Sequence, residues 1–258
     1  MPMLTIGNEA FHYQLEGPKG APVLMLSNSL GTDLTMWNTQ AAAWSQSFRV
    51  LRYDSRGHGR STAPARPYSI AELGRDALAI MDALKLDRVH WCGLSKGGMV
   101  GQWLLTNARD RIGKSVLANT ASRMGPPELW NTRIRTVTAS GLGAIADTTR
   151  ERWFSPKARA SANPEIDRII ETFRSVPVAG YCGCCAAIRD MDQHWSIRSI
   201  ANPVLVIIGK HDPATPPAAG EHIARSIRGA KKKLLDAAHL SNIEQPAAFT
   251  RAVAEFLA

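Results

Sequence analysis

The fold of this chain is decided by the stretch Val89-His90-Trp91-Cys92-Gly93-Leu94-Ser95-Lys96-Gly97-Gly98-Met99. Its first four residues predict a strand, and the run from Gly97 onward predicts a helix. Between them lies the motif Gly-x-Ser-x-Gly, whose glycines let a strand and a helix approach closely around a tight turn. Ser95 at such a turn is a candidate nucleophile. The alternative is a glycine-rich turn with an incidental serine.

Short apolar runs alternate with longer amphipathic stretches around this motif, as is typical of a largely parallel sheet flanked by helices. The predicted strands are Phe11–Leu15, Val23–Ser27, Arg49–Tyr53, Arg88–Cys92, Lys114–Ala118, Val204–Ile208 and Lys233–Leu235. The predicted helices include Ile70–Leu84, Lys96–Asn107, Glu221–Ile227 and Pro246–Leu257. We therefore expect an α/β fold.

The alternation of short apolar runs with amphipathic stretches stops between residues 122 and 199. Helical patterns, tryptophans and proline breaks occur there without a convincing apolar strand. We interpret residues 122–199 as a helical cap inserted into a core of residues 1–121 and 200–258. The cap would cover the carboxyl ends of the strands, where open α/β sheets bind ligands.

A serine hydroxyl becomes a good nucleophile only when a base takes its proton and an acid orients that base. In strand–serine–helix folds the acid precedes the base along the chain. Asp212 follows one buried apolar run and His239 follows the next, which would place both beside Ser95 at the same edge of the sheet. These three residues are the predicted catalytic set.

Simpler interpretations exist for each partner. Asp212 could hold a turn before Pro213, and His239 could cap the following helix. His211 is a rival base, but it directly precedes the acid instead of lying on a separate loop.

Catalysis by such a serine also needs backbone N–H groups that bind the oxyanion. The amide of Lys96 follows the nucleophile, and the amide of Leu30 would come from the loop Asn28-Ser29-Leu30-Gly31 after a predicted strand. That loop could otherwise be a simple turn.

Composition limits the classes of partner. The 258 residues are 45% hydrophobic and 21% charged, which is typical of a folded globular chain with one main domain. The net charge of +9 suits nucleic acid, an acidic surface or a small anionic substrate. Its cations are scattered apart from Lys231-Lys232-Lys233, which we interpret as the solvated start of a strand, and no nucleic-acid motif is present. We expect no nucleic-acid partner.

Cysteine usage and the N-terminal sequence indicate a compartment. Four cysteines, namely Cys92, Cys182, Cys184 and Cys185, are too few and too crowded for a disulfide framework, and their spacing does not match that of a zinc site. We expect free thiols and no metal. The N-terminus lacks the pattern of a secretory signal, and no apolar stretch approaches the roughly 18 residues that span a bilayer. We expect a cytoplasmic protein that does not enter membranes.

Several runs of residues extend beyond these general motifs. They are Ser27-Asn28-Ser29-Leu30-Gly31-Thr32 with Met36-Trp37, Arg49-Val50-Leu51-Arg52-Tyr53-Asp54, Arg56-Gly57-His58-Gly59, Gly93-Leu94-Ser95, Val116-Leu117-Ala118-Asn119-Thr120-Ala121 and His239-Leu240-Ser241-Asn242-Ile243-Glu244. Through them the sequence resembles the 3-oxoadipate enol-lactonase family of α/β-hydrolases over most of its length. The first and last runs are the most specific to the lactonases.

The resemblance implies an eight-stranded sheet with an inserted helical cap and a cofactor-free serine hydrolase with Ser95, Asp212 and His239 as its triad. It implies that 3-oxoadipate enol-lactone is opened to 3-oxoadipate through an acyl-enzyme, in aromatic catabolism. Such a small anionic lactone or ester carries a carboxylate that an arginine can bind through both oxygens. Trp130 and Arg133 match a Trp-x-x-Arg pattern associated with the family, although Arg133 could also be a surface residue.

Position 96 departs from this family, which commonly has leucine or methionine after the nucleophile. A cation in the first turn of a helix opposes the helix dipole by roughly 0.3 to 1 kcal/mol when exposed, and burial would cost more. We favour a Lys96 side chain that reaches solvent. The alternative is a charge that contacts an anionic substrate or tunes His239.

Other functions fit the same residues. The runner-up is a broader carboxylesterase or lactonase, or a carbon–carbon bond hydrolase, with the same triad. A noncatalytic ligand-binding protein of this fold is the alternative from a different class. The sequence leaves the oligomeric state open, a homo-oligomer included.

Overall fold

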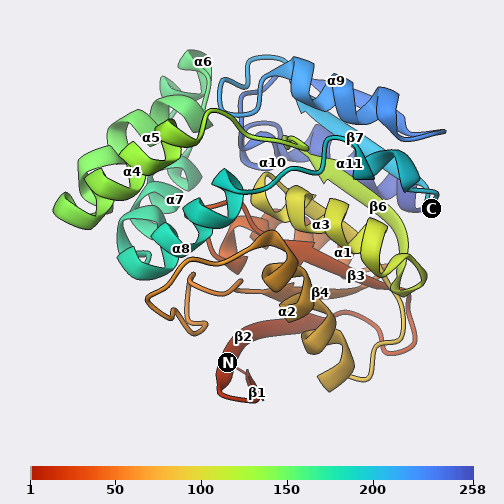
Figure 1. The fold of residues 1–258 in the computed structure, drawn as a ribbon. Coiled ribbons are helices and arrows are strands. Elements are labelled where there is room, and N and C mark those ends of the chain that lie inside the picture. The colour runs from red at the N-terminus through yellow and green to blue at the C-terminus, as the bar shows by residue number, and fades with distance from the viewer. Residues whose placement is uncertain (1) are drawn as a thin grey trace.

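The computed structural model describes residues 2–258, and its centre is a single eight-stranded sheet (Figure 1). The strands are β1 (Met3–Ile6), β2 (Glu9–Glu16), β3 (Val23–Ser27), β4 (Arg49–Tyr53), β5 (Val89–Leu94), β6 (Ile112–Ala118), β7 (Val204–Gly209) and β8 (Lys231–Leu235). Their spatial order is β1-β2-β4-β3-β5-β6-β7-β8. The pairs β1–β2 and β2–β4 are antiparallel and the remaining pairs are parallel. The expected α/β fold with a mostly parallel sheet is confirmed.

The burial of each strand agrees with the pattern of its residues. Strand β7, which lies between β6 and the edge strand β8, is buried along its whole length, which explains its uninterrupted apolar run. In edge strand β8 the three lysines 231–233 are exposed, as expected for a solvated start of a strand. Strand β1 was absent from the sequence prediction, because four residues that alternate between exposed and half-buried positions carry little periodic signal.

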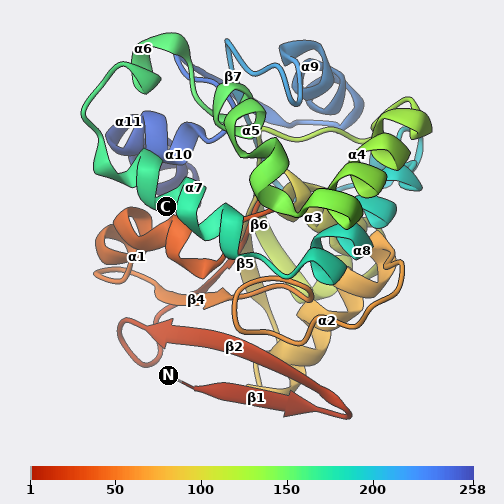
Figure 2. The same cartoon turned by 90° about the vertical axis from the view of Figure 1, so that its left-hand side faces the viewer.

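Helices cover both faces of the sheet (Figure 2). Those of the core are α1 (Asn38–Trp44), α2 (Ile70–Ala83), α3 (Lys96–Asn107), α9 (Pro217–Ser226), α10 (Ser241–Glu244) and α11 (Pro246–Leu257). Helices α1 and α11 pack together on one face, and α2 packs against α3 on the other. Helix α9 begins four residues before the predicted Glu221, because Pro217 is favourable in a first turn.

Between β6 and β7 the chain forms helices only: α4 (Pro127–Ser140), α5 (Ala146–Trp153), α6 (Pro156–Arg159), α7 (Pro164–Ser175) and α8 (Val178–Arg189), with short 3-10 turns. The ends of this segment meet, since Gln193 donates a backbone hydrogen bond of 2.8 Å to Ser122 and Arg123 forms an isolated bridge with Asp192. The expected helical cap is therefore present, and in Figure 2 its helices lie in front of the sheet. Its division from the core at residues 122 and 199 stays a prediction.

The described helices are short. Within residues 2–258, no helix has both the length and the apolar character needed to cross a membrane.

Candidate active site

Ser95 lies at the turn between β5 and α3. Its φ of +57° and ψ of −115° are unusual for a residue with a side chain, and such strain is typical of functional turns. The flanking glycines are required sterically. A Cβ atom at Gly93 would lie 2.1 Å from the Gly97 carbonyl oxygen, and one at Gly97 would lie 2.2 Å from that of Ser27. The glycine spacing read from the sequence thus corresponds to close backbone contacts on both sides of Ser95.

Asp212 and His239 lie together at the carboxyl ends of β7 and β8. The Nδ1 atom of His239 is 2.8 Å from Oδ2 of Asp212, and both residues are buried. Asp212 also accepts hydrogen bonds from the backbone and hydroxyl groups of Thr215 and from the Asn119 amide. Burial acts to raise the pKa of Asp212, but the contact with His239 and these hydrogen bonds hold that pKa below its ordinary value. The acid is therefore kept ionised beside the imidazole.

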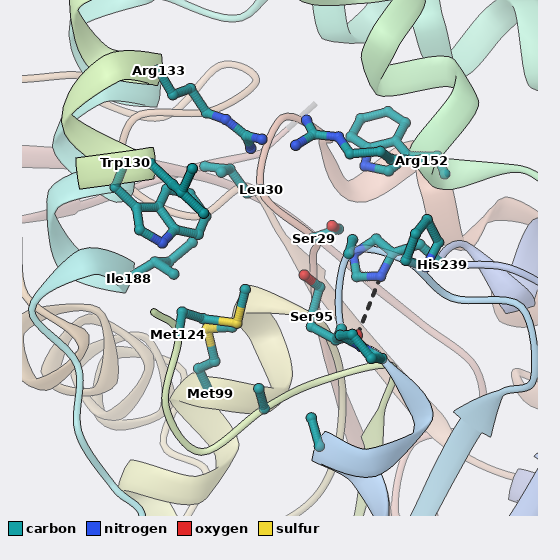
Figure 3. A pocket seen from close by; sticks show the side chains of 18 of the residues that line it. Ser29, Leu30, Ser95, Met99, Met124, Trp130, Arg133, Arg152, Ile188 and His239 are labelled. Atoms are coloured by element: carbon teal, nitrogen blue, oxygen red, sulfur yellow. Dashed lines mark hydrogen bonds between the residues drawn. The ribbon is translucent and has the colours of Figure 1, made fainter. Parts of the chain in front are cut away.

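This contact fixes the role of each imidazole nitrogen. When Nδ1–H donates to a carboxylate, a neutral histidine has an unprotonated Nε2 that can accept a proton. His239 and Ser95 line the same cavity, and Figure 3 shows the serine hydroxyl and the imidazole ring facing the same space. The arrangement can activate a hydroxyl for attack on a carbonyl group.

The loop after β3 carries Leu30 and is held firmly. The Asn28 side chain donates to the Tyr53 carbonyl oxygen over 2.9 Å and accepts from the Trp37 indole over 3.0 Å. The N–H of Gly31 donates to Nε2 of His58 over 2.8 Å. These bonds make the loop a rigid structure and not a simple turn, and they fix the backbone on either side of Leu30.

Two backbone N–H groups are available near Ser95. Lys96 is the first residue of α3, so its N–H has no acceptor within the helix. The N–H of Leu30 makes no hydrogen bond within residues 2–258. Leu30 lines the cavity beside Ser95. The two amides can serve as donors to an oxyanion.

The cavity has a volume of about 390 Å³ between the sheet edge and the cap. Its floor carries Ser29, Ser95 and His239, while α4 and α5 contribute its roof. Apolar side chains cover much of the remaining wall, namely Met99, Met124, Leu129, Trp153 and Ile188. A mostly apolar pocket with a few polar groups at one end suits a small organic substrate.

Two arginines of the cap extend into this cavity. Arg133 from α4 and Arg152 from α5 point toward each other across it (Figure 3). The guanidinium carbon of Arg133 is 5.1 Å from the Trp130 ring centroid, which is a cation–π contact. Across residues 2–258, neither arginine has a carboxylate within ion-pairing distance. The roof therefore presents positive charge to a ligand.

Arg152 was missed by the sequence prediction. It lies in the run Thr149-Arg150-Glu151-Arg152-Trp153, where Arg150 looks equivalent. In the structure Arg150 pairs with Asp167 over 2.9 Å, whereas Nε of Arg152 is buried and has no partner within residues 2–258. Only the orientation of α5 distinguishes the two.

The predicted exposure of Lys96 is wrong. Its side chain is 1% exposed, and its ammonium group donates to the Ser55 hydroxyl and lies 3.9 Å from the Cys184 sulfur in α8. The turn at Ser95 directs this side chain below the cap and away from the cavity, whose lining does not include it. Contact with the substrate is therefore excluded in this conformation. Burial lowers the pKa of Lys96, although Cys184 and Asp54 act in the opposite direction.

The four cysteines are free thiols. Cys182, Cys184 and Cys185 belong to α8, where Cys184 and Cys185 are fully buried. Burial raises the pKa of the Cys184 thiol. Over the described chain, no group of three or more histidine, cysteine, aspartate and glutamate side chains is arranged to hold a metal ion.

Comparison with known proteins identifies close relatives. Residues 22–246 match the family described as alpha/beta hydrolase fold. The chain is 38% identical over 250 residues to 3-oxoadipate enol-lactonase 2 of Acinetobacter baylyi, covering 97% of this chain and 94% of that protein. It is 37% identical to 3-oxoadipate enol-lactonase 1 of the same organism, covering 95% and 91%.

Two solved structures closely resemble the structure of this chain. The enol-lactonase from Burkholderia xenovorans LB400 superimposes with a TM-score of 0.97 and 43% sequence identity, over 99% of each chain. A hydrolase from Pseudomonas aeruginosa PA01 superimposes with a TM-score of 0.96, also at 43% identity, over 99% of this chain and 97% of that one.

Proposed function

Because this chain belongs to the 3-oxoadipate enol-lactonase family of α/β-hydrolases and is a carboxylic ester hydrolase, we propose that it opens 3-oxoadipate enol-lactone to 3-oxoadipate through an acyl-enzyme. The observation that carries this proposal is the hydrogen bond between His239 and Asp212 beside Ser95, at the floor of a cavity roofed by arginines. Opening the lactone ring needs a nucleophile and a base, and binding the substrate carboxylate needs a cation.

The first half of the reaction forms the acyl-enzyme. Nε2 of His239 takes the proton of Ser95 as its oxygen attacks the lactone carbonyl, and Asp212 stabilises the imidazolium that results. The N–H groups of Leu30 and Lys96 bind the negative oxygen of the tetrahedral intermediate. These donors are held in place before substrate arrives, so little reorganisation is needed as the charge develops.

Ring opening expels an enolate. His239 or water protonates it, and its conversion to a ketone makes the step hard to reverse. The acyl group stays on Ser95 until a water molecule, activated by His239, attacks the ester and releases the acid. Both halves of the reaction thus use the same base and the same oxyanion donors.

The substrate carboxylate belongs at the roof of the cavity. Arg133, oriented by its contact with Trp130, is the proposed anchor, since a guanidinium group can bind both carboxylate oxygens. Arg152 from the opposite wall adds a second positive charge. With the carboxylate between these groups, the lactone ring extends toward Ser95 at the floor.

The decisive experiment measures kcat/KM for 3-oxoadipate enol-lactone beside neutral lactones and esters. We expect the enol-lactone to be the best substrate, and Ser95→Ala to abolish turnover of every member of the panel. A preference for neutral esters would instead identify a broader carboxylesterase. Folded protein that hydrolyses nothing would favour a ligand-binding protein.

Participation in aromatic catabolism and a cytoplasmic location are part of the same proposal. The first rests on the sequence resemblance and the second on the sequence patterns described above.

A further inference from the structure

The hydroxyl of Ser29 is a polar group at the cavity wall to which the mechanism gives no role. Ser29 lies between Asn28 and Leu30 in the loop after β3, is 1% exposed and lines the cavity with Ser95 and His239. Its Oγ atom has no hydrogen-bond partner within residues 2–258. Figure 3 shows this hydroxyl on the same side of Ser95 as the His239 ring.

An unpartnered hydroxyl is unusual in a folded protein. Leaving a buried donor unsatisfied costs roughly 1 to 3 kcal/mol, and what sets Ser29 apart from other unpartnered groups is its place at the cavity wall. Two threonine hydroxyls at the cavity wall have partners. Thr215 donates to Asp212 over 2.7 Å, and Thr149 accepts from Arg152 over 3.4 Å. Ser29 alone among these groups is free to meet a ligand.

The backbone around Ser29 is fixed, so its hydroxyl is preorganised. Its own N–H donates to the Met36 sulfur over 3.4 Å, and the neighbouring Asn28 side chain is held at both ends by the bonds described above. Only rotations about the Cα–Cβ and Cβ–Oγ bonds remain for the hydroxyl. A donor with this little freedom loses little entropy when it binds a developing charge.

We propose that the Ser29 hydroxyl is a catalytic hydrogen-bond donor to the enolate oxygen that leaves when the lactone ring opens. The proposal rests on the lactonase function proposed above. The carbonyl oxygen already has two donors in the N–H groups of Leu30 and Lys96. The leaving oxygen must lie within reach of His239, which carries the proton, and Ser29 lies on that side of the nucleophile.

The step balances without a further reactant. Oγ of Ser95 forms a bond to the carbonyl carbon and its proton moves to His239. The bond between that carbon and the ring oxygen then breaks, and its electron pair stays on the oxygen as an enolate. Ser29 donates a hydrogen bond to this oxygen and keeps its own proton. The His239 imidazolium returns its proton to the enolate, which becomes the ketone. Because the ring oxygen is nearly neutral before bond breaking, the hydrogen bond is stronger in the transition state than in the bound lactone.

The test compares Ser29→Ala with Ser115→Ala on two substrates. Ser115 in β6 is also a buried serine whose hydroxyl has no partner in the described part of the chain, but it lies outside the cavity, so it is a matched control. The substrates are 3-oxoadipate enol-lactone and p-nitrophenyl acetate, whose phenolate leaves readily without help. The measured quantity is kcat/KM, which reports the steps up to acylation.

We expect Ser29→Ala to lower kcat/KM for the enol-lactone by about 10- to 100-fold and to lower that for p-nitrophenyl acetate far less. Ser115→Ala should leave both values unchanged, and thermal unfolding should show that both variants fold. Equal losses on the two substrates would overturn the proposal, because they would make Ser29 a donor to the carbonyl oxygen. Unchanged lactone turnover would overturn it as well. A parent enzyme that leaves the enol-lactone intact would instead refute the proposed function, and this inference with it.

Discussion

The imidazole of His58 accepts a hydrogen bond of 2.8 Å from the backbone N–H of Gly31, the residue that follows Leu30. The other ring nitrogen, Nδ1, lies 3.3 Å from the Arg56 carbonyl oxygen, so His58 is a neutral histidine with the proton on Nδ1. The Arg-Gly-His-Gly motif therefore acts on the proposed oxyanion loop from outside the cavity. His58 is a positioning residue.

Substitution of His58 should separate this role from simple packing. We expect His58→Leu to lower kcat for the enol-lactone by about tenfold with little change in KM, because the Leu30 amide is then less well oriented. His58→Gln offers a carbonyl oxygen to Gly31 and should recover part of the activity. Steady-state kinetics of both variants provide the measurement. A leucine variant as active as the parent would show that the loop needs no support from position 58.

Burial of His58 should also make stability depend on pH. Burial, reinforced by the charge of Lys96, lowers the pKa of His58 well below its ordinary value. The unfolded chain therefore binds a proton near pH 6.5 that the folded chain does not bind, and stability falls as the pH drops below that value. One such group contributes at most about 1.4 kcal/mol per pH unit. Urea unfolding between pH 7 and pH 5 should show a smaller decrease for His58→Gln than for the parent.

Substitution of Lys96 tests whether its buried side chain is needed for stability or for activity. Replacing a buried ion pair with apolar side chains of similar volume is often neutral or stabilising, by about 1 to 4 kcal/mol, because burying each charge is costly, and the same cost applies to the buried Lys96 ammonium group. Lys96→Met should thus be at least as stable as the parent, and because the backbone amide is retained, its kcat should be nearly unchanged. Urea unfolding and lactone kinetics test the two parts. Joint loss of stability and activity would show that the contacts with Ser55 and Cys184 are needed.

The sequence predicted those parts of the site that depend on local order along the chain. Ser95, Asp212 and His239 each follow a strand, and parallel strands bring their carboxyl ends to one edge, so their proximity could be expected from topology alone. The direction of a side chain depends on tertiary contacts instead. Lys96 was expected in solvent but lies under the cap, because the strained backbone at Ser95 sets its direction.

The roof of the cavity was less predictable for a related reason. Helices α4 and α5 are held by contacts among cap helices, and nothing in the local sequence shows which side of α5 faces the core. Arg133 was identified through a family pattern, whereas Arg152 had no such pattern. A cavity between two layers is built from residues far apart in sequence, and periodicity within one helix does not identify the partner layer.

Loss of a cap arginine should affect anionic substrates selectively. Arg133→Ala removes the proposed carboxylate anchor, so we expect kcat/KM for the enol-lactone to fall by about 10- to 100-fold, mainly through KM, while a neutral ester is affected little. Arg135→Ala is a matched control on the same helix, since Arg135 is exposed, pairs with Glu128 over 2.6 Å and lies outside the cavity. Arg133→Lys should recover only part of the loss, because an ammonium group cannot bind both oxygens in a plane. If Arg133→Ala changed the neutral ester as much as the enol-lactone, the carboxylate contact would be refuted and a general role in shaping the cavity would replace it.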